Sequence, residues 1–313
     1  MNKFKKSVAA ISLAALSITG VSACSGSVKT VGGLTSKIEN CVITFDIGGT
    51  STAEVNFELY LNYAPATIEH FKYLAGKGYY DGTIVSNAAE SYFVEFGDYT
   101  ADEKGDYVSK YGDAENGYYK YITESYAKGK TVGENRAAYR GDLLSLCGEF
   151  SGNGIYLGKN KKSNPLSLTG ALVLKREKDG DDADNRNSAR GGVAITLSSG
   201  GYYNSSNDFA VFGKVKDTAD TDNVKKLVEN NLKDGDGNSY YYYAYESGIN
   251  DLGNYFMKDE EGNYFARTAS GEYTVSLEDD AYEDLKKEFS EKSDYMLLIP
   301  RTQIKVVSIK FSK

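Results

Sequence analysis

The stretch that most restricts how this chain can fold is FELYLNYAPATIEHFKYLAGKGYYDGTI, residues 57–84. It begins within EVNFELYL (54–61), where apolar and polar residues alternate as they do in a strand with one buried face. Pro65 then suits the first turn of a helix, and apolar residues follow it at helical spacing. Gly76 and Gly78 are expected to end that helix. The pattern predicts a strand that leads directly into a short helix and then a turn.

Further segments have the features of short strands, with apolar and β-branched residues bounded by turn-forming sequence. They are CVITFDI (41–47), SYFVEFGD (91–98), TGALVLKRE (169–177), VAITLSSG (193–200), FAVFGKV (209–215) and IKVVSIKF (304–311). TADTDNVKKLVENNL (218–232) predicts a second, amphipathic helix with Asp220 or Thr221 as its cap. Many short strands with two helices predict a mainly β fold, a closed β-barrel whose ends are covered by helices.

Two long segments interrupt this pattern. Residues 100–168 are polar, rich in glycine and tyrosine, and show no strong periodicity. Residues 233–296 contain NSYYYYAYE (238–246), a predicted hairpin at 262–277 and a predicted helix at 279–292. We interpret both segments as inserts in the barrel.

The N-terminus has the three parts of a secretory signal: the charged MNKFKK, a short apolar run at 7–21 and the small residues of VSAC. The apolar run is too short to span a bilayer well. The position of Cys24 resembles the bacterial lipobox, which implies cleavage before Cys24 and lipidation of its thiol. An ordinary signal peptide with an incidental cysteine is the alternative. We predict a lipoprotein signal peptide at 1–23, a flexible tether at 24–40, and a lipid-anchored, extracytoplasmic protein at the cell membrane.

The composition narrows the possible partners. A net charge of −8 argues against nucleic acid, since proteins that bind it carry a basic face. The 27 tyrosines and the absence of tryptophan fit tyrosine in half-buried strands, or alternatively surfaces that contact peptides. Cys41 and Cys147 could pair in an exported protein, but we expect two unpaired thiols.

Two acidic loops, DGDDADN (179–185) and DGDGNSY (234–240), place carboxylates at alternating positions. The second is similar to the start of a calcium-binding loop, but Ser239 stands where such a loop has glycine. Asp-Gly pairs also form ordinary turns. We predict neither a metal site nor a cofactor, with calcium as the alternative.

The order of these elements resembles the cyclophilin-type peptidyl-prolyl isomerases. Residues 57–84 are similar to the family's strand, helix and turn, and FVEFGD, GALVL, FAVFGKV and IKVVSIKF are similar to its later strands. The resemblance covers 41–98, 169–228 and 299–311. It implies one domain at 41–313, built as an eight-stranded antiparallel barrel capped by two helices. It also implies an outer groove that binds a proline-containing peptide.

The chemistry of this family needs a hydrogen-bond donor. Rotation about a peptide bond meets a barrier of ~18–20 kcal/mol because the nitrogen lone pair is delocalised. A donor aimed at that nitrogen stabilises the twisted amide, and in cyclophilins the donor is an arginine. Aligned from Gly82, the position of this catalytic arginine is occupied by Asn87, a neutral and shorter side chain.

The resemblance also assigns the groove. The pocket that holds the proline ring maps to Tyr92 and Phe93, which are large and apolar. The groove glutamine becomes Glu95, a ring of the pocket is lost near Ala194, and the family's histidine falls on Phe209.

Three other side chains, on Arg186, Arg190 and His70, carry nitrogen donors that could substitute for the arginine. Arg190, with Arg186, lies in a charged loop that borders the groove in the family, so Arg190 is a candidate cation. His70 is the only histidine and lies in the predicted helix, where we expect a solvated position and no catalytic role. Hydrolase triads are disfavoured because they need a suitable histidine near a nucleophile.

These observations lead to two hypotheses. The first is a monomeric cyclophilin-type peptidyl-prolyl isomerase (rotamase) of weak activity, which assists the folding of exported proteins at the outer face of the cytoplasmic membrane. The alternative is a catalytically inactive module that binds peptides or a protein through the same groove.

Overall fold

A computed structural model describes most of the barrel and parts of both inserts. The described residues are 27–89, 92–101, 107–111, 117–141, 144–176, 183–198, 203, 205–217, 219–225, five short strands between 241 and 299, and 303–312. The predicted signal peptide, the acidic loop at 234–240, most of the loop at 179–185 and the predicted helix at 279–292 lie outside them.

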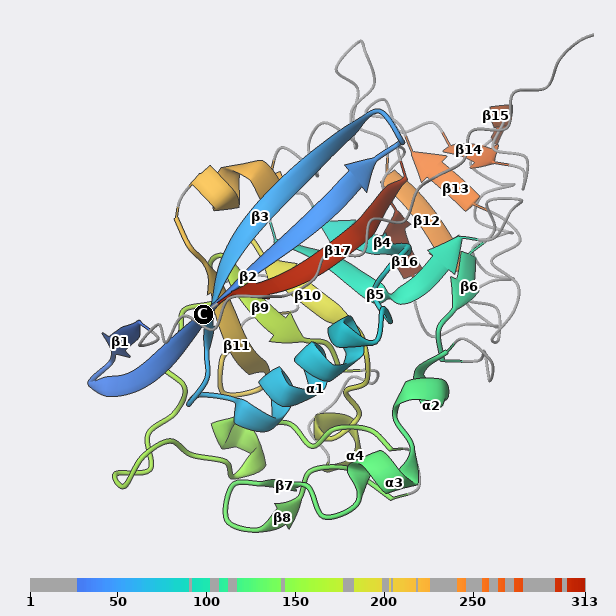
Figure 1. Ribbon diagram of the computed structural model, residues 1–313. Coiled ribbons are helices and arrows are strands. Elements are labelled where there is room, and N and C mark those ends of the chain that lie inside the picture. Colours follow the sequence, from blue (N-terminus) through green and yellow to red (C-terminus); the bar gives the residue numbers. More distant parts are fainter. Residues whose placement is uncertain are drawn as a thin grey trace, which may run out of the picture.

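A ring of eight antiparallel strands forms the centre of the molecule (Figure 1). The predicted closed antiparallel barrel is confirmed, because β3 pairs with β11 on one side and with β2 on the other, which closes the ring. In spatial order the strands are β2 (Leu34–Ile47), β17 (Ile304–Ser312), β4 (Thr83–Ala89), β5 (Phe93–Ala101), β10 (Val193–Thr196), β9 (Ala171–Leu174), β11 (Ala210–Val215) and β3 (Ser51–Tyr60).

The interior of the ring is a single apolar core, as alternation along the strands predicts. Apolar residues of the strands and of α1 are buried in one cluster, among them Phe57, Leu59, Ile68, Phe71, Val94, Leu172, Ile195 and Phe212. Ile309 is partly buried against the same cluster. Other buried side chains form a second, smaller cluster, which includes Val173, Ala194 and Phe209.

Helix α1 (Pro65–Gly76) has the bounds that the sequence indicates. Pro65 occupies its first turn, and the buried Phe71 contacts Phe212 with ring centroids 5.1 Å apart. Gly78 has a φ of 73°, which allows its amide and that of Tyr79 to bond back to the last turn of the helix. The apolar face of α1 therefore covers the core of the ring.

A second helical segment follows β11 at residues 219–225. The predicted cap is wrong: the Asp217 side chain accepts a hydrogen bond from the Asp220 amide at 3.1 Å. The Asp220 carboxylate instead accepts from the backbone amide and side chain of Asn56 on β3. The Asp220 side chain therefore bonds to β3 and does not cap the helix.

The predicted tether is also wrong over residues 28–40. β1 (Val28–Val31) pairs with the start of β2, and β2 continues along β3 with Ile38 opposite Tyr60. Ile38 is buried in the second cluster. Along residues 35–38 exposed and buried side chains alternate, with Ser36 and Ile38 on the buried side.

The first insert packs on the core instead of forming a separate unit. Its Tyr118, Ile122, Leu146 and Phe150 belong to the same cluster as the barrel interior. Its elements are short: β6 (Tyr107–Ser109), α2 (Tyr118–Tyr121), α3 (Glu124–Ala127), β7 (Thr131–Val132), β8 (Arg136–Ala137) and a 3-10 turn at Ser151–Asn153. One further turn of helix, α4 (Ala183–Arg186), precedes β10.

The second insert contributes a five-stranded antiparallel sheet. The predicted hairpin is confirmed as paired strands, and β16 lies beside β4 of the ring (Figure 1). The order is β15 (Tyr273–Leu277), β14 (Tyr264–Arg267), β13 (Tyr255–Lys258), β12 (Tyr241–Tyr245) and β16 (Met296–Ile299).

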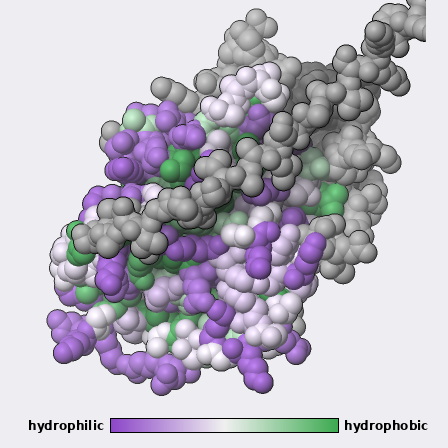
Figure 2. Space-filling model, in the orientation of Figure 1, coloured by the Kyte–Doolittle hydropathy of each residue, from purple (hydrophilic) through white to green (hydrophobic). Residues whose placement is uncertain are grey.

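The two thiols are buried and unpaired, as expected for Cys41 and Cys147. On the face seen in Figure 2 the described residues are mostly hydrophilic, with small and scattered hydrophobic areas. None of the helices within the described residues has the length and apolar character needed to cross a membrane.

Candidate active site

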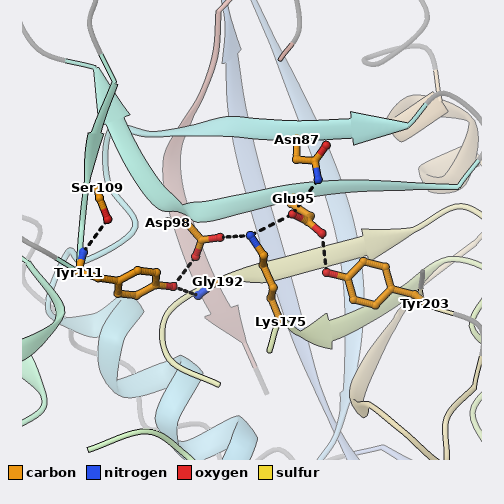
Figure 3. Close-up of polar contacts among 8 residues, drawn as sticks. All are labelled: Asn87, Glu95, Asp98, Ser109, Tyr111, Lys175, Gly192 and Tyr203. Carbon is orange, nitrogen blue, oxygen red and sulfur yellow. Dashed lines mark hydrogen bonds and ion pairs between the residues drawn. The ribbon is translucent and has the colours of Figure 1, made fainter. Parts of the chain in front are cut away.

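A bulge in β4 places Asn87 on the outer face of the ring. Val85 pairs with Phe96 and points into the core, whereas Asn87 pairs with Glu95, so Ser86 is an extra residue in β4. Without this extra residue, strict alternation would turn Asn87 inward like Val85. The Asn87 Nδ2 donates to Glu95 Oε2 at 3.1 Å (Figure 3).

Glu95 accepts from three different parts of the chain. Besides Asn87, the hydroxyl of Tyr203 donates to Oε1 at 2.7 Å. The ammonium of Lys175, the residue after β9, lies 3.1 Å from Oε2. Only 3% of the Glu95 side chain is exposed, and its three partners hold the carboxylate in one position.

Asp98 forms the second half of the same cluster. Lys175 Nζ donates to Asp98 Oδ2 at 2.6 Å, and the hydroxyl of Tyr111 donates to Oδ1 (Figure 3). The amide of Gly192 donates in turn to the Tyr111 oxygen at 3.1 Å. A Cβ at Gly192 would lie 2.3 Å from Asp98 Oδ1, so a glycine is needed for the carboxylate to occupy this place.

Aromatic side chains cover the outer face beside Glu95. Tyr203 is fully buried, with its ring 5.3 Å from that of Phe93 and 4.9 Å from that of Phe209. Ala194 is buried in the same cluster. The structure thus brings three predicted groove residues together around Tyr203, a side chain that sequence reasoning missed. Tyr92 is 45% exposed at the rim.

The cation at Glu95 is Lys175, and Arg190 lies farther along the network. The Arg190 guanidinium is over the rings of Tyr111 and Tyr119, at 5.1 and 5.5 Å from their centroids. Sequence reasoning also missed Lys175, although a signal was present. Residue 175 is two positions after Val173 and therefore shares its face, the face that carries Ala194 and Glu95 across the sheet.

The expectation of a solvated His70 is wrong. His70 is fully buried, and its Nε2 donates to the Arg190 carbonyl at 2.7 Å. Its Nδ1 therefore accepts from the Tyr139 hydroxyl at 2.9 Å. Burial lowers the pKa of His70 to about 4, so the ring is neutral. The first insert, which supplies Tyr139, covers the face of α1 that the sequence left exposed.

Within the part of the chain that the structure describes, no cluster of three or more His, Cys, Asp or Glu side chains could hold a metal ion. The calcium alternative concerns residues that lie mostly outside that part. The described site offers hydrogen-bond donors on Asn87, Tyr203 and Lys175 and the carboxylates of Glu95 and Asp98.

Comparison with known proteins identifies the family. A model described as "Cyclophilin type peptidyl-prolyl cis-trans isomerase/CLD" matches residues 43–238. Peptidyl-prolyl cis-trans isomerase ppi1 of Schizosaccharomyces pombe is 39% identical over 64 residues, 20% of this chain and 41% of that protein. Peptidyl-prolyl cis-trans isomerase-like 1 of Neurospora crassa is 36% identical over 56 residues, 18% of this chain and 34% of that protein. The chain thus spans less than half the length of these relatives.

Solved structures give more distant matches. A cyclophilin-type isomerase of Cryptosporidium parvum has 16% identity and a TM-score of 0.36, over 63% of this chain and 88% of its own. The Mimivirus cyclophilin has 14% identity and a TM-score of 0.35, over 64% and 82%. The family model spans more than half of the 313 residues, and on that ground the chain belongs to the cyclophilin-type peptidyl-prolyl cis-trans isomerase family.

Proposed function

We propose that this protein is a slow peptidyl-prolyl isomerase, which acts on proline-containing segments of exported proteins at the outer face of the cytoplasmic membrane. The observation that carries the proposal is the pairing of Asn87 with Glu95 on the outer face of a ring of this family. These two positions match the family's donor and its groove glutamine, and the ring holds them facing each other.

The residues at these positions account for a low rate. Asn87 can donate to the amide nitrogen, but it is neutral, and hydrogen bonds from charged donors are roughly twice as strong. Its Nδ2 is also directed at the Glu95 carboxylate. Removal of one preorganised donor typically costs ~10²–10³ in rate. We therefore expect catalysis well below that of a family member with arginine.

The second candidate is a peptide-binding module without turnover. The observation that favours it is Tyr203, whose buried ring lies among Phe93, Ala194 and Phe209, three residues that the resemblance assigns to the groove. A peptide would then bind against Tyr92 and Phe93 at the surface, and its proline would not be held for rotation.

The proposed location is supported by the sequence at residues 1–24. Its charged start, apolar run and small residues before Cys24 have the order of a lipoprotein signal. Lipid chains on Cys24 would hold the folded ring at the membrane surface, where emerging exported chains contain proline bonds that isomerise over tens to hundreds of seconds.

The test is the rate of proline isomerisation in a short Ala-Pro peptide, measured by NMR exchange with the chain from Ser25 onward. Acceleration that is saturable by peptide supports the isomerase. Saturable binding without acceleration supports the binding module, and the absence of both contradicts the proposal.

A further inference from the structure

Lys175 reaches the site because the strand between it and Glu95 has almost no side chains in the way. The Lys175 amide donates to the Gly192 carbonyl at 2.9 Å, which extends the pairing of β9 with β10 by one residue. The side chain then runs over β10, where Gly192 and Ala194 are small, to β5 (Figure 3). Because Ala194 has no ring, no large side chain separates the Lys175 ammonium from Glu95.

The three ionisable side chains of this cluster, Glu95, Asp98 and Lys175, differ in how far they are exposed. The side chains of Glu95 and Asp98 are 3% and 2% exposed, whereas that of Lys175 is 19% exposed. Of the three charged side chains, that of Lys175 is therefore the one a peptide on this face would meet. The two carboxylates below it hold Nζ in place at 3.1 and 2.6 Å, and a group fixed in advance loses little conformational freedom on binding.

The three candidate donors differ in charge and position. Asn87 lies at the site but is neutral. Arg190 is charged but stacks on Tyr111 and Tyr119, beyond Asp98. Lys175 is charged and contacts the same Glu95 oxygen as Asn87.

The geometry points to Lys175 as the cationic donor to the bound peptide, at the prolyl amide or the adjoining carbonyl oxygen. This inference rests on the proposed function, which supplies the peptide and the reaction. Lys175 takes over the charge that Asn87 lacks, and it does so from β9 instead of β4. Its ammonium exchanges a contact to Glu95 or Asp98 for one to the peptide while the other carboxylate keeps it in position.

The experiment compares the full chain in detergent with Lys175→Met and Lys175→Arg, using NMR exchange and direct binding of the same Ala-Pro peptide. We expect kcat/KM of Lys175→Met to fall by ~10²-fold, or to the uncatalysed rate, as for loss of one preorganised donor. Lys175→Arg should retain measurable turnover because it keeps the charge. Lys72→Met is the matched control, since it breaks the Lys72–Glu39 ion pair between α1 and β2 and should leave turnover unchanged.

Lys175→Met leaves two buried carboxylates without their cation, which itself can destabilise the fold. The triple variant Lys175→Met, Glu95→Gln, Asp98→Asn removes all three charges together. If Lys175→Met unfolds early in a thermal scan, the triple variant carries the test, and its turnover should be as low. A folded variant without Lys175 that turns over like the wild type overturns the inference and leaves the proposed function standing.

Peptide binding separates the two ideas when the wild type shows no turnover. In that case the proposed catalysis fails, and the dissociation constant decides about Lys175. A Kd that is ~10-fold larger in Lys175→Met, as expected when a charge-assisted hydrogen bond is lost, supports the contact with the peptide. Lys175→Arg should restore the wild-type Kd. An unchanged Kd, or no binding by any of the proteins, overturns it.

Discussion

Asn87 on β4 and Glu95 on β5 face each other across the outer surface of the ring, with Nδ2 and Oε2 3.1 Å apart. The bulge at Ser86 creates this pairing. The resemblance to the family predicts that its donor and its groove glutamine stand at these two positions, and the side chains present here bond to each other. The Asn87 side-chain amide bonds to the Glu95 carboxylate, which Lys175 and Tyr203 also contact.

Restoring the family pair should raise the rate of isomerisation. Asn87→Arg with Glu95→Gln introduces a charged donor and removes the carboxylate that would bind it. Because Ala194 provides no ring to fix the proline, and misplacement by about 1 Å can cost roughly 10²-fold, we expect a gain of ~10-fold and not the full ~10²–10³. Asn87→Arg alone is the control, and its arginine should pair with Glu95 and give a smaller gain. A double variant no faster than the single one would contradict this account.

Phe212 should be a principal residue of the core. It is fully buried in the cluster that fills the ring and contacts Phe71 of α1. Phe212→Ala should lower the free energy of unfolding by ~3–5 kcal/mol, measured by urea unfolding. Tyr156→Ala, at a 48% exposed aromatic, is the matched control and should change it little. A loss well below 1 kcal/mol for Phe212→Ala would remove this residue from the core.

Glu149 should make the protein less stable as the pH rises. Its carboxylate accepts from the Thr67 amide at 2.6 Å, in the first turn of α1, and burial raises its pKa from 4.5 to about 7. Between pH 4.5 and pH 7 Glu149 keeps its proton in the folded state but has lost it in the unfolded state. The free energy of unfolding therefore falls as the pH rises through this range.

Glu149→Gln keeps an acceptor for Thr67 but cannot titrate. The difference in unfolding free energy between variant and wild type should move in favour of the variant from pH 4.5 to pH 8. Glu124→Gln, at an exposed residue of α3, is the matched control for the substitution itself. A difference that is the same at both pH values would contradict the buried, protonated state of Glu149.

His70 should have the opposite effect. Burial lowers its pKa from 6.5 to about 4, so the unfolded state binds the proton first and stability is lost as the pH falls below 6.5. His70→Asn should be destabilised at pH 7, where the bonds to Arg190 and Tyr139 are lost. The difference between the unfolding free energies of wild type and variant should shrink towards pH 4.5. A deficit that grows on acidification would show that His70 is charged in the folded protein.

The lipid anchor can be tested in cells. Cys24→Ser should release the protein from the membrane fraction or leave an unprocessed precursor, because the thiol that carries the lipid is absent. The fractions are compared by immunoblot, with Cys41→Ser as the control that keeps Cys24. A Cys24→Ser protein that remains mature and membrane-bound would exclude lipidation at this position.

The sequence by itself determined α1 and seven of the eight strands of the ring, but not β4, which carries Asn87. Pro65, Gly76 and Gly78 bounded α1, and alternation located the seven strands, because these signals depend on neighbours a few positions away. It also located Asn87 and Glu95, since both lie in the segment that resembles the family. It failed at residues 28–40, where small polar residues gave no strand signal until β3 supplied a partner for β2.

Only the tertiary structure decided which groups meet at the site. Lys175 and Asp98 are 77 positions apart, and Tyr203 and Glu95 are 108 apart. The sequence predicts a solvated His70 because nothing in its own helix covers it, whereas Tyr139 of the first insert, 69 positions along the chain, packs on it. Side chains on separate strands and inserts come together through closure of the ring and packing on its faces. Local periodicity carries no record of those contacts, because it reports only the direction of each side chain relative to its own element.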